Sequence, residues 1–402
     1  MAVHLQVPEH LLPIKGIRLA TINAGIRYKN RDDMLLIEAA EGSSVAAVFT
    51  RNAFCAAPVT IARQHLAQAS IRYLMVNAGN ANAGTGSQGL VAATHTCAAL
   101  AQIASVSTNQ VLPFSTGVIG VQLPAEKIVS ALPALFESLT EDHWMTAARA
   151  IMTTDTLPKG ISKQVNIGGK TVTITGIAKG AGMIHPNMAT MLSYIATDAE
   201  VEASLLQQTL SSVVDDTFNC ITIDGDTSTN DALVLIATGA SGVVVGDNEL
   251  ATFQTALKAV CLFLAQAIVR DGEGATKFID VQVEQARSRE EAHTVANTVA
   301  LSPLVKTALF ASDPNWGRIL AAVGRSPIDS LDVSRISIYL GDTLLVKGGQ
   351  PSPDYTEAQG QVETKKDEIK IRIILGRGDA LANVWTCDFS FDYVKINAEY
   401  RS

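Results

Sequence analysis

Charged and aromatic side chains are scarce in this sequence. Of its 402 residues, 17% are charged and 5% are aromatic, whereas 47% are hydrophobic. A chain this apolar can bury large hydrophobic cores, so we do not expect it to be disordered. Its length is sufficient for two or three domain-sized units. The formal net charge is −8, and no basic run is long enough to follow a phosphate backbone. Nucleic acid is therefore not expected as a partner.

Paired cysteines and metal-binding spacings are also lacking. The five cysteines are an odd number spread singly along the chain, and the seven histidines are equally scattered. We therefore expect reduced thiols, no disulfide framework, no metal site and no cofactor. The first 16 residues lack the apolar core of a signal peptide, and the most apolar run, "AVCLFLAQAIV", is about half a membrane span. These features predict a soluble cytoplasmic protein without a membrane segment.

Strand patterns occur in several parts of the chain. Gly168-Gly169 separates two β-branched runs, which predicts a hairpin because glycine adopts positive φ in tight turns. Residues 369–375 and 385–396 alternate apolar and polar side chains, as half-buried strands do. We expect both segments to be strands.

Helix patterns are interspersed with these strands. One helix is predicted to start at Asp198 as N-cap, a second to span 248–270, and a third to begin near Ser288. Ser302-Pro303 interrupts the third pattern, where a new helix can start. The mixture predicts an α/β or α+β fold with antiparallel elements.

Three polar, glycine-rich segments are candidate functional loops. "NAGNANAGTGSQG" (77–89) lacks the glycine order of a nucleotide-binding loop, so close backbone packing with Asn in left-handed conformations is the better interpretation. "FSTGVIG" (114–120) places a hydroxyl beside a glycine amide, a pair that can donate to one oxyanion, although a turn between strands explains it more simply. "DGDTSTND" (224–231) lacks the spacing of a calcium loop and is expected to be a polar turn.

The segment "KGAGMIHPNMATML" (179–192) places one threonine, Thr190, after an unusual density of turn residues. No GxSxG or HExxH motif offers another nucleophile. An internal threonine lacks a built-in base, but a cut before Thr190 would free an α-amine of pKa about 7.7–8.0 that can accept the hydroxyl proton. The turn residues could bend the backbone so that the Thr190 hydroxyl reaches the carbonyl carbon of Ala189. An ordinary half-buried strand threonine remains the alternative from these residues alone.

Longer motifs give the chain a family resemblance. In order, it carries "NAGNANAGTG", "STGVIG", "TTDTLPK", "AKGAGMIHPNMATML", "TFNCITIDGDTSTND", "VRDGEGATKFI" and "DPNWGRILAAVG", and it closes on "KINAEYRS". Over nearly its whole length it resembles the ornithine acetyltransferase family, the glutamate N-acetyltransferases of arginine biosynthesis. The resemblance implies a self-cleaving α/β fold with mixed and antiparallel sheets packed by helices, similar to but distinct from N-terminal-nucleophile hydrolases. It also implies cleavage between Ala189 and Thr190 into an α chain (1–189) and a β chain (190–402), assembled as α2β2.

The same resemblance assigns the candidate site. Thr190 would be the nucleophile, and Thr116 and Gly117 would stabilise the oxyanion. The residues expected to line the substrate site with Thr190 are Thr153, Lys179, Glu273, Asn397 and Ser402. The adjacent Thr154 is an alternative to Thr153, and Ser402 stands where a family member can have Thr, which keeps the hydroxyl.

The reaction implied is a double displacement. N2-acetylornithine would donate its acetyl group to Thr190, ornithine would leave, and glutamate would take the acetyl group. No metal or organic cofactor is needed; acetyl-CoA is at most a second donor. Two alternatives stay open: an amidase or aminopeptidase that uses the same N-terminal threonine with water as acceptor, and a non-enzymatic protein whose glycine-rich loops bind a nucleotide.

Overall fold

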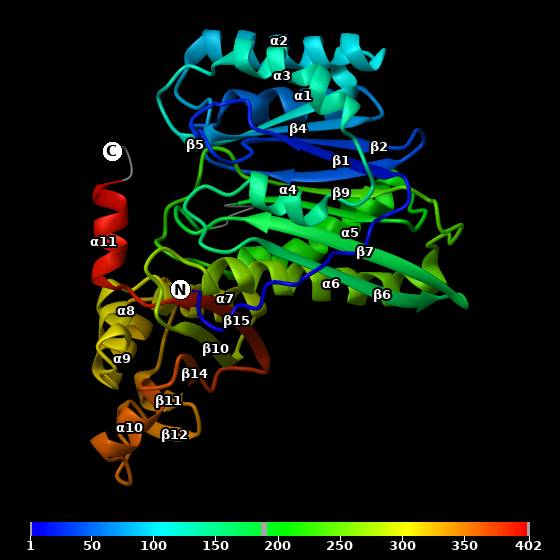
Figure 1. Cartoon of the computed structure of the whole chain (residues 1–402). Helices are drawn as coiled ribbons and strands as arrows, with labels where there is room; N and C mark the ends of the chain where they lie inside the picture. The colour runs from blue at the N-terminus through cyan, green and yellow to red at the C-terminus, as the bar shows by residue number, and fades with distance from the viewer. Residues whose placement is uncertain (1, 186–190, 400–402) are drawn as a thin grey trace.

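The molecule is built in layers, with two stacked β-sheets between two helical layers and a third sheet beside them (Figure 1). The computed structural model describes residues 2–185 and 191–399. The mixed α/β fold with mixed and antiparallel sheets predicted from the sequence is confirmed.

The first sheet has the strand order β1-β2-β4-β5 and comes entirely from the N-terminal part of the chain. Its strands are β1 (Ile17–Ile22), β2 (Met34–Ala39), β4 (Tyr73–Asn80) and β5 (Val111–Val118). β1, β2 and β4 pair antiparallel, whereas β4 and β5 are parallel. Alternate residues of β2 face opposite layers: Leu35 and Ile37 pack toward the second sheet, and Met34 packs toward the outer helices.

The second sheet joins segments from both sides of residues 186–190. Its order is β3-β9-β8-β7-β6, and the strands are β3 (Ser44–Phe49), β9 (Ala232–Ala237), β8 (Leu192–Thr197), β7 (Lys170–Lys179) and β6 (Lys159–Ile167). β8 pairs antiparallel with β7 and parallel with β9. Gly168 and Gly169 form the β6–β7 turn with φ of 59° and 81°, which confirms the predicted hairpin.

Helices cover the outer faces of the two sheets. The helices of this part are α1 (Ala57–Gln68), α2 (Gly86–Ala104), α3 (Ala125–Glu137), α4 (Trp144–Ala150), α5 (Ala203–Asp215) and α6 (Asp247–Arg270). α2 and α3 share a core with the first sheet, and α5 and α6 share one with the second, whereas α1 and α4 contribute side chains to the core between the two sheets. Short 3-10 turns follow α2 and α5, at Thr108–Gln110 and Phe218–Cys220.

Helix α6 is long and apolar enough to span a membrane by length and composition, but 56% of its most apolar window is buried inside the protein. It packs on β6 and β7 and contributes Leu257, Val260 and Leu264 to the core. It is therefore a core helix, as predicted for residues 248–270, and it ends at Arg270 as expected.

The C-terminal part forms the third sheet, in the order β13-β12-β11-β14-β10-β15. Its strands are β10 (Phe278–Ala286), β11 (Ser337–Leu340), β12 (Thr343–Lys347), β13 (Gln350–Pro351), β14 (Glu368–Ile374) and β15 (Ala380–Cys387). Its helices are α7 (Arg289–Ala300), α8 (Pro303–Phe310), α9 (Trp316–Gly324), α10 (Glu357–Thr364) and α11 (Phe391–Ala398), with a 3-10 turn at Val333–Arg335. The predicted strand at 369–375 and the helix starts capped by Ser288 and Ser302 are confirmed.

Two local predictions are wrong. Residues 385–396 do not form one strand, because β15 ends at Cys387 and the Ser390 hydroxyl accepts a hydrogen bond from the Tyr393 amide at 3.3 Å, which caps helix α11. Asp198 is not the N-cap of α5, because its carboxylate accepts from the Thr173 amide at 2.9 Å and the cap is Glu202.

Candidate active site

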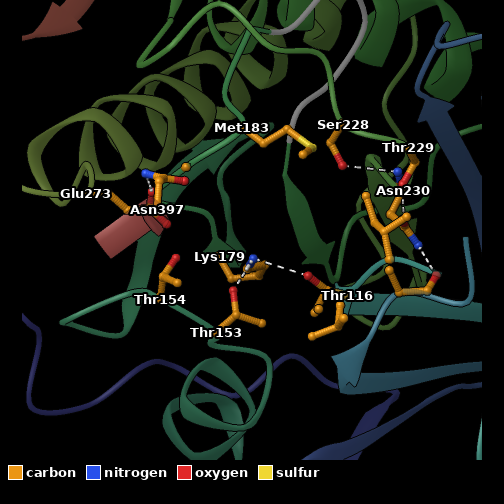
Figure 2. Close-up of a pocket in the computed structure, with 15 residues that line it drawn as sticks. Thr116, Thr153, Thr154, Lys179, Met183, Ser228, Thr229, Asn230, Glu273 and Asn397 are labelled. Atoms are coloured by element: carbon orange, nitrogen blue, oxygen red, sulfur yellow. Dashed lines mark hydrogen bonds between the residues drawn. The ribbon is translucent and has the colours of Figure 1, made fainter. Parts of the chain in front are cut away.

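A cavity of about 250 Å³ lies where strand ends of the two stacked sheets meet segments from the third part of the chain (Figure 2). It is lined by every predicted site residue that the structure describes: Thr116, Gly117, Thr153, Lys179, Glu273 and Asn397. Thr154 lines it as well, so both candidate threonines face the same cavity. The chain thus brings together residues separated by up to 281 positions (116 to 397).

Lys179 lies at the centre of this site. It is the last residue of β7 and is buried. Its ammonium donates hydrogen bonds to the hydroxyls of Thr153 at 2.8 Å and Thr116 at 3.2 Å. Burial lowers the pKa of Lys179, and the carboxylates of Asp155 and Glu273 offset only part of that effect. Of the two candidate threonines, Thr153 is therefore the one whose hydroxyl accepts a hydrogen bond from Lys179.

Thr116 and Gly117 lie at the end of β5, within the strand rather than in a turn, so the simpler interpretation of "FSTGVIG" is wrong. The β4–β5 ladder is irregular at Gly79–Asn80, and Gly117 has φ 134°. A Cβ on Gly117 would lie 2.3 Å from the Gly79 carbonyl carbon, so only glycine fits. Since the Thr116 oxygen accepts from Lys179, its own proton can point to an acceptor in the cavity.

Glu273 follows helix α6 and is 7% exposed, so a solvated surface carboxylate is ruled out. Its carboxylate accepts a hydrogen bond from Asn397 of α11 at 2.8 Å, which ties the C-terminal helix to the cavity. A Cβ on Gly182 would lie 2.4 Å from the Glu273 carboxylate, so a glycine there leaves room for it. Among the described residues, no Lys, Arg or His lies within salt-bridge distance of Glu273.

A network of buried ion pairs connects two of the segments that line the cavity. Lys159 bridges Asp155 at 2.7 Å and Asp271 at 2.6 Å, and all three side chains are 0–1% exposed. Although burial alone would raise it, the cations Lys159 and Lys179 hold the pKa of Asp155 well below its ordinary value. Asp155 also accepts from the amide of Thr153 at 3.0 Å. The network therefore fixes the backbone that carries Thr153 next to the loop that carries Glu273.

The strand that follows position 190 enters this site. β8 pairs with β7 so that Leu192 lies opposite Lys179, and the Ala232 amide donates to the Met191 carbonyl at 2.9 Å. Met191 is buried and lines a second cavity of about 30 Å³ that also includes Thr116 and Lys179. Three predicted site residues lie outside the described part of the chain: Ala189, Thr190 and Ser402.

The loop 224–231 contributes residues that sequence reasoning missed. The Asp224 carboxylate accepts from the Met183 amide at 2.6 Å, and the Asn230 side chain donates to the Ser115 carbonyl at 2.9 Å. The main cavity is therefore also lined by Ser228, Thr229 and Asn230. In the sequence, these residues are indicated only by the run of polar side chains in "DGDTSTND", which lies immediately before an apolar strand.

Comparisons with known proteins identify the chain's relatives. The ArgJ family profile matches residues 18–402. The arginine biosynthesis bifunctional protein ArgJ of Methylococcus capsulatus is 58% identical, over 98% of this chain and 97% of that protein. The crystal structure of this bifunctional protein from Bacillus halodurans is 41% identical with a TM-score of 0.51, covering 52% of this chain and 100% of that chain. Ornithine acetyltransferase from Mycobacterium tuberculosis, solved with ornithine, is 33% identical with a TM-score of 0.38, covering 44% and 94%. The resemblance seen in the motifs is confirmed: this chain belongs to the ArgJ family, the bifunctional acetyltransferases of arginine biosynthesis.

Proposed function

We propose that this acetyltransferase moves the acetyl group of N2-acetylornithine to glutamate through an ester on Thr190. The observation that carries the proposal is one cavity that holds a buried ammonium, Lys179, and a buried carboxylate, Glu273, beside the hydroxyl of Thr116. Substrates that are amino acids offer both a carboxylate and an ammonium to such a cavity.

The nucleophile would be created by a cut between Ala189 and Thr190. A free α-amine at Thr190 can accept the proton of its own hydroxyl, which an internal threonine cannot do. The burial of Met191 beside Lys179 supports a nucleophile at position 190.

The acetyl transfer would take two steps. The Thr190 oxygen attacks the acetyl carbon, its proton passes to the α-amine and on to the departing nitrogen, and the C–N bond breaks to release ornithine. Glutamate's amine then attacks the ester carbonyl and the C–O bond breaks. The proton that the amine loses passes through the α-amine of Thr190 to its oxygen, which restores the hydroxyl and releases N-acetylglutamate. In both steps the negative oxygen would receive hydrogen bonds from the Thr116 hydroxyl and the Gly117 amide.

Charge would select the substrates. Among the described residues no cation lies within salt-bridge distance of the buried Glu273 carboxylate, so the δ-ammonium of acetylornithine would supply one. Lys179 has three N–H donors, and the hydroxyls of Thr116 and Thr153 use two. Among the described residues the third has no further partner, so it would be available for a substrate carboxylate, while Asn397 and Ser402 would add neutral hydrogen bonds.

The proposal extends to assembly and location. Two α chains and two β chains would form an α2β2 enzyme in the cytoplasm, with acetyl-CoA as the further donor that a bifunctional enzyme would use. Helix α11 supports an assembly, because Phe391 is 83% exposed and Val394 is 65% exposed on it.

Mass spectrometry of the reacting enzyme tests the proposal. With N2-acetylornithine and no glutamate, the β chain should gain one acetyl group on Thr190, and added glutamate should remove it as acetylglutamate. Thr190→Ala should gain none and should stay a single chain. Release of free acetate at the same rate without glutamate would contradict the proposal and favour a hydrolase.

A further inference from the structure

Asn230 is a buried side chain at the candidate site that the proposed reaction does not use. It lies in the loop 224–231, shortly before β9, and is 7% exposed. It lines both cavities together with Thr116 (Figure 2). Its side-chain nitrogen donates hydrogen bonds to two backbone carbonyls, that of Ser115 at 2.9 Å and that of Ala81 at 2.6 Å.

The two carbonyls determine which end of the Asn230 amide faces them. A carbonyl can only accept, so the nitrogen lies on this side and uses both of its N–H groups. At the other end, the Asn230 oxygen accepts a hydrogen bond from the Thr229 hydroxyl, and the backbone amide of Asn230 donates to the Ser228 hydroxyl at 3.1 Å. Asn230 thus has no side-chain N–H left for a substrate. If it contributes to the reaction, it does so through the groups that it holds.

The carbonyls that Asn230 holds lie next to the proposed oxyanion donors. The Ser115 carbonyl and the Thr116 amide belong to one planar peptide unit, so a hydrogen bond at this carbonyl restricts how the chain enters Thr116. β5 is the last strand in the order of the first sheet, and Ala81 directly follows the end of β4. One side-chain amide therefore joins the ends of β4 and β5 at the place where Thr116 and Gly117 lie.

A second set of hydrogen bonds holds the same strand ends. The Ser115 hydroxyl donates to the side-chain oxygen of Asn77 at 2.6 Å, and the Asn77 side-chain nitrogen donates to the Asn80 carbonyl at 2.9 Å. All three side chains are buried. Ser115 is thus held both at its carbonyl and at its hydroxyl, which leaves the adjacent Thr116 little freedom to move.

We propose that Asn230 is the positioning residue of the oxyanion hole formed by Thr116 and Gly117. By holding the carbonyls of Ser115 and Ala81, its amide directs the two donors to one place in the cavity. This inference rests on the proposed function and adds the residue that keeps the donors in position. Donors that are fixed before the reaction stabilise an oxyanion without having to reorient. A displacement of about 1 Å in such a site can lower the rate about 10²-fold.

The rate of ornithine release from N2-acetylornithine with glutamate tests the inference, with kcat expressed per cut chain on a denaturing gel. Asn230→Ala removes the amide without adding charge, and Asn230→Asp keeps the size of the side chain. Each should lower kcat about 10- to 100-fold. KM should change much less, because Asn230 has no donor to offer the substrate. A kcat near that of wild type in either variant that folds would overturn the inference.

Asn82→Asp is the matched control. Asn82 is also buried, and its side-chain nitrogen also donates to a backbone carbonyl, that of Gly89 in α2, at 3.0 Å. Aspartate tolerates the positive φ of 48° at this position. Because this hydrogen bond leads to the outer helix and not to β5, kcat should stay near that of wild type. An equal fall in kcat for Asn82→Asp and Asn230→Asp would overturn a specific role of Asn230.

A double-mutant cycle separates positioning from a general effect on the fold. If Asn230 acts through the Thr116 hydroxyl, its loss should matter less once that hydroxyl is absent. Asn230→Ala should therefore lower kcat by a smaller factor in the Thr116→Ala background than in wild type. The same factor in both backgrounds would overturn the positioning role.

The outcomes also separate this inference from the proposed function. Ornithine release reports the first half of the reaction, which a transferase and a hydrolase share. Release of acetate in place of acetylglutamate would contradict the proposed acceptor, while the comparison of kcat between wild type and the Asn230 variants would still decide the role of Asn230. Wild-type kcat in the Asn230 variants would overturn this inference and leave acetyl transfer to glutamate intact.

Discussion

The Lys179 ammonium donates a hydrogen bond to the Thr116 hydroxyl at 3.2 Å, joining the end of β7 in the second sheet to the end of β5 in the first. Because the ammonium occupies a lone pair of the Thr116 oxygen, the hydroxyl proton is directed elsewhere. A hydroxyl oriented in this way is suited to stabilise an oxyanion in the cavity between the two strands.

Thr116→Ala should lower kcat of acetyl transfer by about 10²–10³-fold, as loss of one oxyanion donor does. KM should change much less, because contacts to the bound substrate are largely kept. Thr116→Ser keeps the hydroxyl and serves as the control, with kcat near that of wild type. A kcat of Thr116→Ala within twofold of wild type would remove Thr116 from the mechanism.

The lowered pKa of Lys179 predicts a pH dependence. Lys179 orients Thr116 only as an ammonium, and its pKa lies below the ordinary value of about 10.4. Activity should therefore fall as pH rises through this lowered pKa. Lys179→Arg keeps its charge to higher pH, so whatever activity it retains should lose this alkaline decline. The pH profile of kcat for both proteins is the measurement, and identical alkaline limbs would contradict the role.

Glu273→Gln should raise KM for N2-acetylornithine and spare glutamate, because only acetylornithine carries a cationic side chain. Loss of one charge-assisted contact costs about 1.5–3 kcal/mol, or roughly ten- to hundredfold in KM. Half-reaction kinetics with each substrate are the measurement, with the exposed cap Glu202→Gln as the control. If both half-reactions fall together, Glu273 instead serves the α-amine of the substrate; unchanged kinetics for both would exclude it from the site.

Lys159→Met should destabilise the protein by about 3–5 kcal/mol, because Asp155 and Asp271 would remain buried without their cation. Lys258→Met is the matched control, since its ion pair with Asp216 is exposed and should contribute only about 0–1 kcal/mol. The free energy of unfolding in urea is the measurement. Equal losses for the two variants would show that the buried network contributes little to stability.

Local sequence patterns predicted elements whose signals are local. The Gly168-Gly169 hairpin and the helix capped by Ser288 were found because their turn and cap residues act on immediate neighbours. The predicted strand at 385–396 was wrong because one cap, Ser390, outweighs the apolar alternation around it.

The candidate site could not be predicted from local sequence patterns, because contacts between residues far apart in the chain form it. From its local sequence, Glu273 is expected on a surface turn after a helix. In the structure it is buried, and its carboxylate accepts a hydrogen bond from Asn397 of α11. The local sequence of the loop 224–231 predicts only a polar turn. In the structure, the Asn230 side chain donates a hydrogen bond to the Ser115 carbonyl on the first sheet. Family resemblance located Glu273 and Asn397, whereas Ser228, Thr229 and Asn230 were found only from the cavity that they line.

The intact mass and N-terminal sequence of the purified protein test the central claim most directly. Self-cleavage before Thr190 should divide the 42.5 kDa chain into pieces of roughly 20 and 22.5 kDa, the larger one starting at Thr190. Thr190→Ala should remain one chain and be inactive. A fully active enzyme that stays a single uncut chain would contradict the account.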